Sequence, residues 1–185
     1  MRLKRSDCCQ DIRYRKKSLF LLGIIMMSLC LISAPSLATP DDGSYHLILN
    51  GRSFHLSEAN NGQSFNENNL GSGFQYDYHS GDRKDWISYF NGSVFNDSLN
   101  NASYYLGAGK ARRFPLLNGW RIDVGYLAFV MARKDFNDYD PFPGILPIAS
   151  IGTRRAAVNI SYIPQLGDAP TELIFLQLKI STKGW

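Results

Sequence analysis

The sequence predicts an all-β protein, an eight-stranded antiparallel up-and-down transmembrane β-barrel, and three observations lead to this fold class. From Tyr45 onward, apolar and polar residues alternate with period two, and turn-forming clusters interrupt the alternation at fairly regular intervals. The interruptions leave eight segments of strand length, an even number, as a small bacterial barrel requires. The N-terminal residues resemble an export leader, which would direct the chain out of the cytoplasm.

Residues 1–38 have the features of a secretory signal peptide, which leaves residues 39–185 as one outer-membrane barrel domain. Seven Lys and Arg residues precede the apolar run at 19–32, and residues 36–38 supply a small-residue cleavage site. The apolar run is too short to favour a stable membrane-spanning helix. All three cysteines lie in the leader, so we expect a mature chain without disulfides or cysteine metal ligands.

Removal of the leader also removes the basic character of the chain. Seven of the 20 Lys and Arg residues and two of the 16 Asp and Glu residues lie in the leader, so the mature net charge is about −1. The pI of about 9.0 therefore gives no indication of nucleic-acid binding. The sequence also lacks a Gly-rich phosphate loop, a basic tract and internal repeats, which argues against nucleotide and nucleic-acid roles.

The strands follow from the alternation and from the turn-rich segments between them. We expect strands at 44–56, 70–79, 85–97, 102–114, 119–133, 144–154, 156–164 and 171–181. Longer and shorter connections alternate, as in a barrel with long outer loops and short inner turns.

Several strands have one apolar and one polar face. In the second strand Phe74 and Tyr76 oppose Gln75, and in the seventh strand Val158 and Ile160 oppose Asn159. A soluble sandwich or a lipocalin-like barrel would show the same alternation, and the pattern alone favours neither. The terminal Trp185, after an apolar alternating strand, favours the outer membrane.

Prolines interrupt the sixth and seventh strands and the loop before them. Pro141, Pro143, Pro147 and Pro164 each lack the backbone N–H that a sheet ladder needs. In a closed membrane barrel, two strands can part at such gaps and admit a lipid tail. The prolines therefore predict a barrel that acts on lipids.

Polar residues end three odd-numbered strands, which all finish at the same rim of an up-and-down barrel. They are His55 after the first strand, Asp97 and Ser98 after the third, and Arg133 after the fifth. An imidazole, a carboxylate and a hydroxyl are the groups that acyl transfer needs, and an arginine can bind a phosphate. Each residue also has a plain structural interpretation, because His at a strand end is often an exposed loop residue and residues 96–100 have an ordinary turn composition.

Several strings of residues match the motifs of one known family. They are Phe95-Asn96-Asp97-Ser98-Leu99-Asn100, Gly107-Ala108-Gly109, and the proline-rich segment from Pro141 to Gly152 that runs on to Tyr162-Ile163-Pro164. Upstream, Phe65-Asn66-Glu67-Asn68 followed by Gly71-Ser72-Gly73-Phe74 resembles the pattern N-E-x-x-W-G-G-G-F of the same family. By these strings the chain resembles the lipid A palmitoyltransferase family, PagP, and the resemblance covers most of the mature chain in the same order.

The resemblance implies an outer-membrane enzyme that moves a palmitoyl chain from a phospholipid to lipid A. It implies that His55, Asp97 and Ser98 are catalytic, that Arg133 is the family's loop arginine, and that Pro147 and Pro164 weaken the seam between the sixth and seventh strands. It also implies an interior acyl-chain cavity with Gly109 at its floor, where the missing side chain leaves room for the tail. No metal or cofactor is expected, the partners are outer-membrane lipids, and we expect a monomer.

The chain departs from the family in having almost no room for an amphipathic helix before the first strand. Two other functions stay open. A lipid A deacylase barrel shares the fold, but the known kind uses a His-x-Ser pair late in the chain, and the last histidine here is His79. A non-catalytic barrel that binds lipopolysaccharide would tolerate alanine at the candidate catalytic positions.

Overall fold

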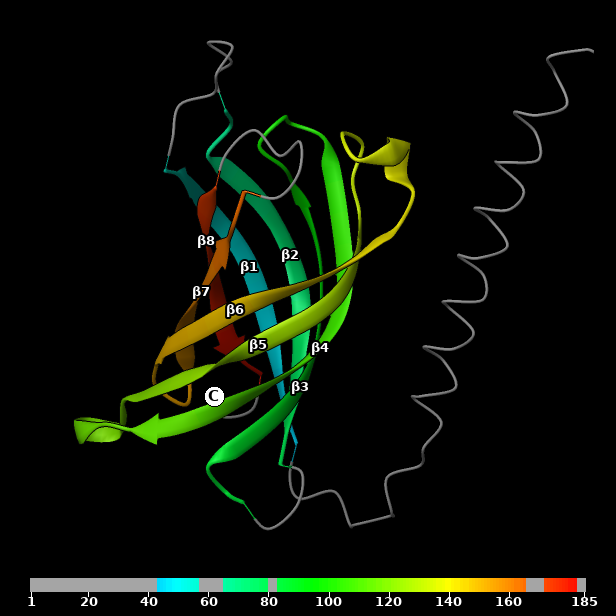
Figure 1. Ribbon diagram of the computed structural model, residues 1–185. Helices are drawn as coiled ribbons and strands as arrows, with labels where there is room; N and C mark the ends of the chain where they lie inside the picture. Colours follow the sequence, from blue (N-terminus) through cyan, green and yellow to red (C-terminus); the bar gives the residue numbers. More distant parts are fainter. Residues whose placement is uncertain (1–42, 57–64, 80–82, 166–171, 183–185) are drawn as a thin grey trace, which may run out of the picture. The chain divides into compact units, whose positions relative to one another are not determined.

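The structure is a computed structural model that describes residues 43–56, 65–79, 83–165 and 172–182 (Figure 1). The predicted leader, the short segment before the first strand and Trp185 lie outside the described residues, so the predictions about them stay predictions. Within the described part of the chain, no helix has the length and hydropathy needed to cross a membrane.

Eight antiparallel strands form one closed barrel, in which each strand pairs with its sequence neighbours and β8 closes on β1. The strands are β1 (Ser44–His55), β2 (Asn68–Tyr78), β3 (Trp86–Asn96), β4 (Ala102–Pro115), β5 (Arg121–Ala132), β6 (Phe142–Gly152), β7 (Ala156–Ile163) and β8 (Leu173–Ser181). The predicted fold class and strand order are confirmed, and each observed strand end lies within two residues of its expected position.

The two rims of the barrel carry different connections. The rim that we call the outer rim, uppermost in Figure 1, carries the connections between β1 and β2, β3 and β4, β5 and β6, and β7 and β8. The inner rim carries the other three connections together with both ends of the sheet. Long loops face outward in bacterial outer-membrane barrels, and the longest connections here lie at the outer rim.

The alternation of the strands separates the lipid-facing surface from the interior. Large apolar side chains are exposed on the outside, among them Leu47, Leu70, Phe74, Leu106, Val124, Tyr126, Ile145 and Leu178. Polar side chains on the opposite strand faces are buried, among them Asn50, Gln75, Asn91, Asn159 and Gln177. This arrangement is that of a membrane barrel, in which the outward face contacts lipid and the inward face lines the lumen.

The interior has an apolar wall and a polar wall. The apolar wall belongs to β3–β6, where Tyr89, Ala111, Leu127, Phe129 and Ile148 form a cluster against which Tyr105, Met131 and Leu146 pack. The polar wall belongs mainly to β8, β1, β2 and β3. Hydrogen bonds of 2.6–3.0 Å link its side chains in the order Asn50, Gln177, Tyr105, Asn91, Gln75 and Asp77. Because each amide and hydroxyl in this series has a partner, the buried polar wall is stable inside the barrel.

The seam between β6 and β7 is incomplete toward the outer rim. The ladder between these strands runs only from Ile148 opposite Ser161 to Gly152 opposite Ala157. The outer half of β6, residues 142–147, therefore pairs with β5 but not with β7. Pro147 lies where the pairing stops, and β7 ends directly before Pro164. Because proline donates no backbone hydrogen bond, these two positions favour a ladder that ends early.

Candidate functional site at the outer rim

The structure brings four of the predicted site residues together at the outer rim. His55 is the last residue of β1, Asp97 and Ser98 follow β3, and Arg133 follows β5. The Nε2 atom of His55 lies 3.0 Å from the Oγ atom of Ser98, within hydrogen-bond distance. A guanidinium nitrogen of Arg133 lies 3.9 Å from a carboxylate oxygen of Asp97. Gly109 and Pro147 lie within β4 and β6 of the barrel wall, and Pro164 directly follows β7.

The ring of His55 is held by an aromatic neighbour. Phe65, in the segment just before β2, stacks on it with the ring centroids 4.3 Å apart and the planes 15° from parallel. Stacking restricts the rotation of the imidazole and keeps Nε2 directed at Ser98. The Nδ1 atom has no hydrogen-bond partner within the described part of the chain. His55 and Ser98 therefore form a base–hydroxyl pair in which Nε2 is the atom positioned for proton transfer.

Asp97 organises the turn that presents Ser98. Its carboxylate accepts hydrogen bonds of 2.9 Å from the backbone N–H groups of Leu99 and Asn101, and a third from the hydroxyl of Ser103. The described contacts of the carboxylate go to this turn and to Arg133, and none goes to His55. The resemblance implies a catalytic Asp97, and the geometry supports a positioning role for Asp97 through Ser98.

One further residue, which was not predicted to belong to the site, holds the same turn. The backbone N–H of Asn66 donates to the carbonyl of Ser98 at 2.9 Å, and the side-chain amide of Asn66 donates to the carbonyl of Asp97 at 3.3 Å. Beside it, the carbonyl of Glu67 accepts from the N–H of Ser53 on β1. Phe65, Asn66 and Glu67 thus join the end of β1 to the turn after β3. The sequence signal for this segment is the motif Phe65-Asn66-Glu67-Asn68, which shows the resemblance but does not indicate which groups these residues contact.

Replacing Asp97 by asparagine should lower the free energy of unfolding by about 1–3 kcal/mol, the cost of disrupting hydrogen bonds of a buried charged group. Asp97 is only 2% exposed, and the variant loses both its charge opposite Arg133 and one acceptor oxygen. Urea-induced unfolding in detergent micelles measures the loss. Asp135→Asn is the matched control, because Asp135 meets the same arginine at an exposed position, where such a pair contributes at most about 1 kcal/mol. Equal losses in the two variants would contradict the role given to Asp97.

Arg133 has a partner in its own loop as well. Its Nε and one terminal nitrogen donate to the two carboxylate oxygens of Asp135 at 2.7 and 2.8 Å. A guanidinium has five N–H donors, so several are left for a ligand. Arg133 is partly exposed at the rim, beside the His55–Ser98 pair, where a planar, permanently charged donor suits a phosphate group.

Gly109 lies on the apolar wall, but the space above it is not open. A side chain at this position would meet the ring of Tyr89, which lies opposite Gly109 in the β3–β4 ladder. The hydroxyl of Tyr89 donates to the backbone carbonyl of Tyr126 at 2.8 Å, so the ring crosses Gly109 toward β5. The structure thus differs from the expectation that the missing side chain leaves room for a lipid tail, because the aromatic side chain of the neighbouring strand fills the gap over the glycine.

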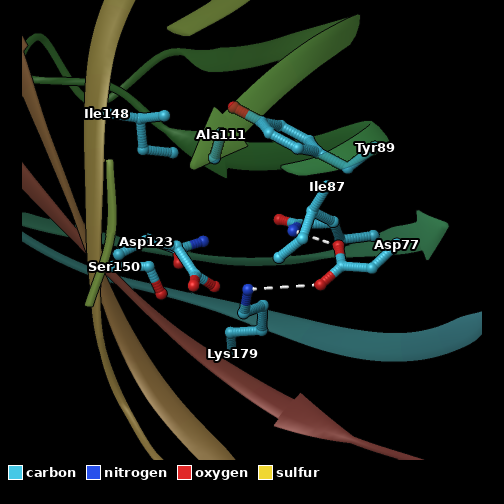
Figure 2. A pocket seen from close by; sticks show the side chains of 10 residues that line it. Asp77, Ile87, Tyr89, Ala111, Asp123, Ile148, Ser150 and Lys179 are labelled. Carbon is cyan, nitrogen blue, oxygen red and sulfur yellow. Dashed lines mark hydrogen bonds and ion pairs between the residues drawn. The ribbon is translucent and has the colours of Figure 1, made fainter. Parts of the chain in front are cut away.

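The interior directly next to Tyr89, on its inner side, is packed. Figure 2 shows Tyr89, Ala111 and Ile148 on one side of a small cavity and Asp77, Asp123 and Lys179 on the other. This cavity has a volume of about 20 Å³, which is room for about one water molecule. An acyl chain would therefore have to lie on the outer side of Tyr89. There the apolar wall presents Tyr105, Met131 and Leu146, next to the incomplete part of the β6–β7 seam.

The site contains the groups for acid–base chemistry at a carbonyl without an evident metal centre. Within the described ranges, no three His, Cys, Asp or Glu side chains lie together in a way that could hold a metal ion. The expectation that the reaction needs no cofactor stays a prediction. Taken together, the fold and the rim cluster define a class: a small membrane β-barrel with a base–hydroxyl pair at its outer rim and an apolar wall beneath it.

Comparison with known proteins gives the family. A family described as "Antimicrobial peptide resistance and lipid A acylation protein PagP" matches residues 38–178. A lipid A acyltransferase PagP of Bordetella pertussis is 32% identical over 127 residues, which cover 67% of this chain and 69% of the relative. The chain therefore belongs to the PagP family, and it is an outer-membrane barrel.

Other relatives match over shorter stretches. The PagP protein of Methylobacillus flagellatus is 41% identical over 71 residues, so the match spans 38% of this chain and 39% of that relative's length. Among solved structures, Neisserial surface protein A covers 75% of this chain and 95% of its own length, with a TM-score of 0.41 and 9% identity. The attachment invasion locus protein Ail of Yersinia pestis has a TM-score of 0.37 and 13% identity over the same shares.

Proposed function

We propose that this barrel transfers a palmitoyl or similar acyl chain from a phospholipid to lipid A in the outer membrane. Acylation of lipid A is the activity of the family to which the chain belongs. The phospholipid donor, the roles of the individual residues and action as a monomer are the added parts of the proposal. The observation that carries it is the 3.0 Å approach of His55 to Ser98 at the outer rim, beside an apolar wall and an incomplete seam.

The proposed reaction exchanges one ester bond for another. His55 removes the proton from the attacking hydroxyl of lipid A, and the new ester forms as the bond between the acyl carbonyl and the phospholipid breaks. The proton on His55 then passes to the departing lysophospholipid oxygen. The hydroxyl of Ser98, held next to His55 by the Asp97 turn, stabilises charge at the reacting carbonyl. Arg133 binds an anionic headgroup, and this binding holds the ester at the rim.

The acyl tail enters the barrel from the side. The outer half of β6, which does not pair with β7, supports entry between β6 and β7 directly from the bilayer. Pro147 on β6 and Pro164 directly after β7 mark where this pairing is lost. The tail then lies along Tyr105, Met131 and Leu146, and its end meets the ring of Tyr89 supported on Gly109. All of these groups come from one barrel, which is why we propose a monomer. Residues 1–38 are proposed to be removed as a signal peptide, and residues 39–185 to form the mature barrel domain.

Lipid A from cells with the gene should be heavier than lipid A from cells without it by the mass of one fatty acyl group. Mass spectrometry of the extracted lipid A measures this difference. A loss of acyl mass would instead indicate a deacylase, and an unchanged spectrum from cells that produce the folded barrel would indicate a non-catalytic lipopolysaccharide-binding barrel. Either of these results would refute the transferase proposal.

A further inference from the structure

A second and larger cavity lies at the inner end of the barrel, opposite to the rim that carries His55. Its volume is about 410 Å³, within the range of ligand-binding pockets in proteins. The residues that line it include Arg113, Arg121 and Arg154, the histidines His46 and His79, and one carboxylate, Asp77. The proposed transfer reaction uses none of these side chains.

Within the described ranges, the arginines of this cavity outnumber their carboxylate partners. Arg113 donates two hydrogen bonds of 2.8 and 2.9 Å to the two oxygens of Asp123. Arg121 forms only a long ion pair with the same carboxylate, because its Nε atom lies 3.7 Å from the nearer oxygen of Asp123. The side chain of Arg121 is only 12% exposed, and its Nε atom is buried without a hydrogen-bond partner in the described part of the chain.

Asp77, the carboxylate that lines the cavity in the described part of the chain, already has partners of its own. Asp77 lies 3.2 Å from Nε2 of His46, 3.5 Å from Nζ of Lys179, and accepts a hydrogen bond of 2.6 Å from Gln75. Figure 2 shows Lys179 directed at one carboxylate oxygen of Asp77, and the hydrogen bond from Gln75 goes to the other oxygen. The charges of Asp77 and Lys179 therefore cancel, and the charge of Asp123 cancels that of Arg113. Among the described residues, Arg121 and Arg154 therefore leave an excess of about two positive charges around the cavity.

A buried guanidinium without a full set of acceptors is costly unless an anion supplies them. Arginine pairs well with phosphate because its planar fork of N–H groups matches two phosphate oxygens. His79 adds a nearby imidazole, whose Nδ1 lies 3.1 Å from the carbonyl of Trp86 and is fixed by it. We propose that the inner end of this barrel is a binding site for a phosphate group, with Arg121 as its principal ligand and Arg154 at its entrance.

The phosphate could belong to a free anion or to a lipid headgroup at the inner face of the membrane, and the experiment separates these sources. The full mature chain, folded in dodecyl maltoside micelles that contain no phosphate, is titrated calorimetrically with inorganic phosphate and, separately, with dihexanoyl phosphatidylglycerol. We expect one site per barrel. Arg121→Gln should weaken binding at least tenfold, and Arg154→Gln should weaken it severalfold.

Arg112→Gln is the matched control. Arg112 neighbours Arg113 in β4 but is exposed, stacks on Phe114 and pairs with Asp85, and it does not line the cavity. This variant should bind either probe as the parent does. Because Arg154 lies in an exposed turn, its variant keeps the test valid even if Arg121→Gln folds poorly.

Each result decides the proposal. Binding of inorganic phosphate with the expected loss in the variants supports a site for the free anion. Binding of the lipid alone, with the same dependence on Arg121 and Arg154, supports a headgroup site. Failure of the parent to bind either probe, or equal affinities for the parent, Arg154→Gln and Arg112→Gln, would overturn the assignment.

Discussion

Replacing His55 by alanine should lower kcat for acyl transfer to lipid A by about 10²–10⁴-fold, the range that a general base contributes. His55 is positioned for this role by the stacking of Phe65 and by the 3.0 Å approach of its Nε2 atom to Ser98. KM should change little, because the imidazole acts on the proton that moves in the transition state rather than on the bound lipids. Transfer of a labelled acyl chain to lipid A in mixed micelles, followed by chromatography, measures both constants.

Two companion variants separate the roles within the cluster. Arg133→Gln should mainly raise KM, since the guanidinium is proposed to bind a headgroup. Lys134→Ala is the control: Lys134 is the exposed neighbour of Arg133 at the same rim, and it has no part in the proposed mechanism. Its kinetics should match those of the parent. If His55→Ala retained parental kcat in a barrel with unchanged far-UV circular dichroism, His55 would not be the base.

The convergence of His55, Asp97, Ser98 and Arg133 was predictable because it follows from connectivity alone. In an up-and-down barrel every second strand runs the same way, so residues that end odd-numbered strands must meet at one rim. The even strand number and the alternation of apolar and polar residues were sufficient for this step. Neither observation required knowledge of any side-chain contact.

The partners of Asp97 were not predictable in the same way. The sequence around it offered two interpretations, an ordinary turn and a catalytic carboxylate, and spacing could not show which groups its oxygens accept from. In the structure the carboxylate bonds the backbone of its own turn, as Asp commonly does, and this same turn presents Ser98 to His55. Both interpretations of the segment therefore describe part of its role.

The filling of the space over Gly109 depends on strand register. The turn at 97–101 pairs Asn96 with Ala102, and from there the antiparallel ladder runs without a shift to Tyr89 opposite Gly109. A sequence prediction that pairs Asn96 with Ala102 across this turn therefore also places Tyr89 opposite Gly109. It would not have given the direction of the ring, which is fixed by the hydrogen bond from Tyr89 to the carbonyl of Tyr126 on β5.

Replacing Tyr89 by alanine should lengthen the acyl chain that the barrel transfers, by about two carbons or more. The substitution removes the ring that lies over Gly109 and opens the end of the apolar wall. Each additional buried methylene contributes about 0.8 kcal/mol, so two of them favour a longer donor chain by about tenfold. Mass spectrometry of lipid A, after incubation with an equimolar mixture of phospholipids with different saturated chains, measures the preference.

Tyr89→Phe is the matched control for this prediction. It keeps the ring and removes only the hydroxyl that donates to Tyr126, so the acyl length should stay that of the parent.

Loss of a buried aromatic side chain costs about 3–5 kcal/mol of stability. Tyr89→Leu leaves a smaller gap, so it provides a better-folded variant with a smaller shift of acyl length in the same direction. Substitution at Gly109 itself is a poorer test, because a new side chain would meet the backbone carbonyl of Tyr126 as well as the ring. If folded Tyr89→Ala and Tyr89→Leu both transferred chains of parental length, the tail would not end at Tyr89, and the proposed path along the apolar wall would be wrong.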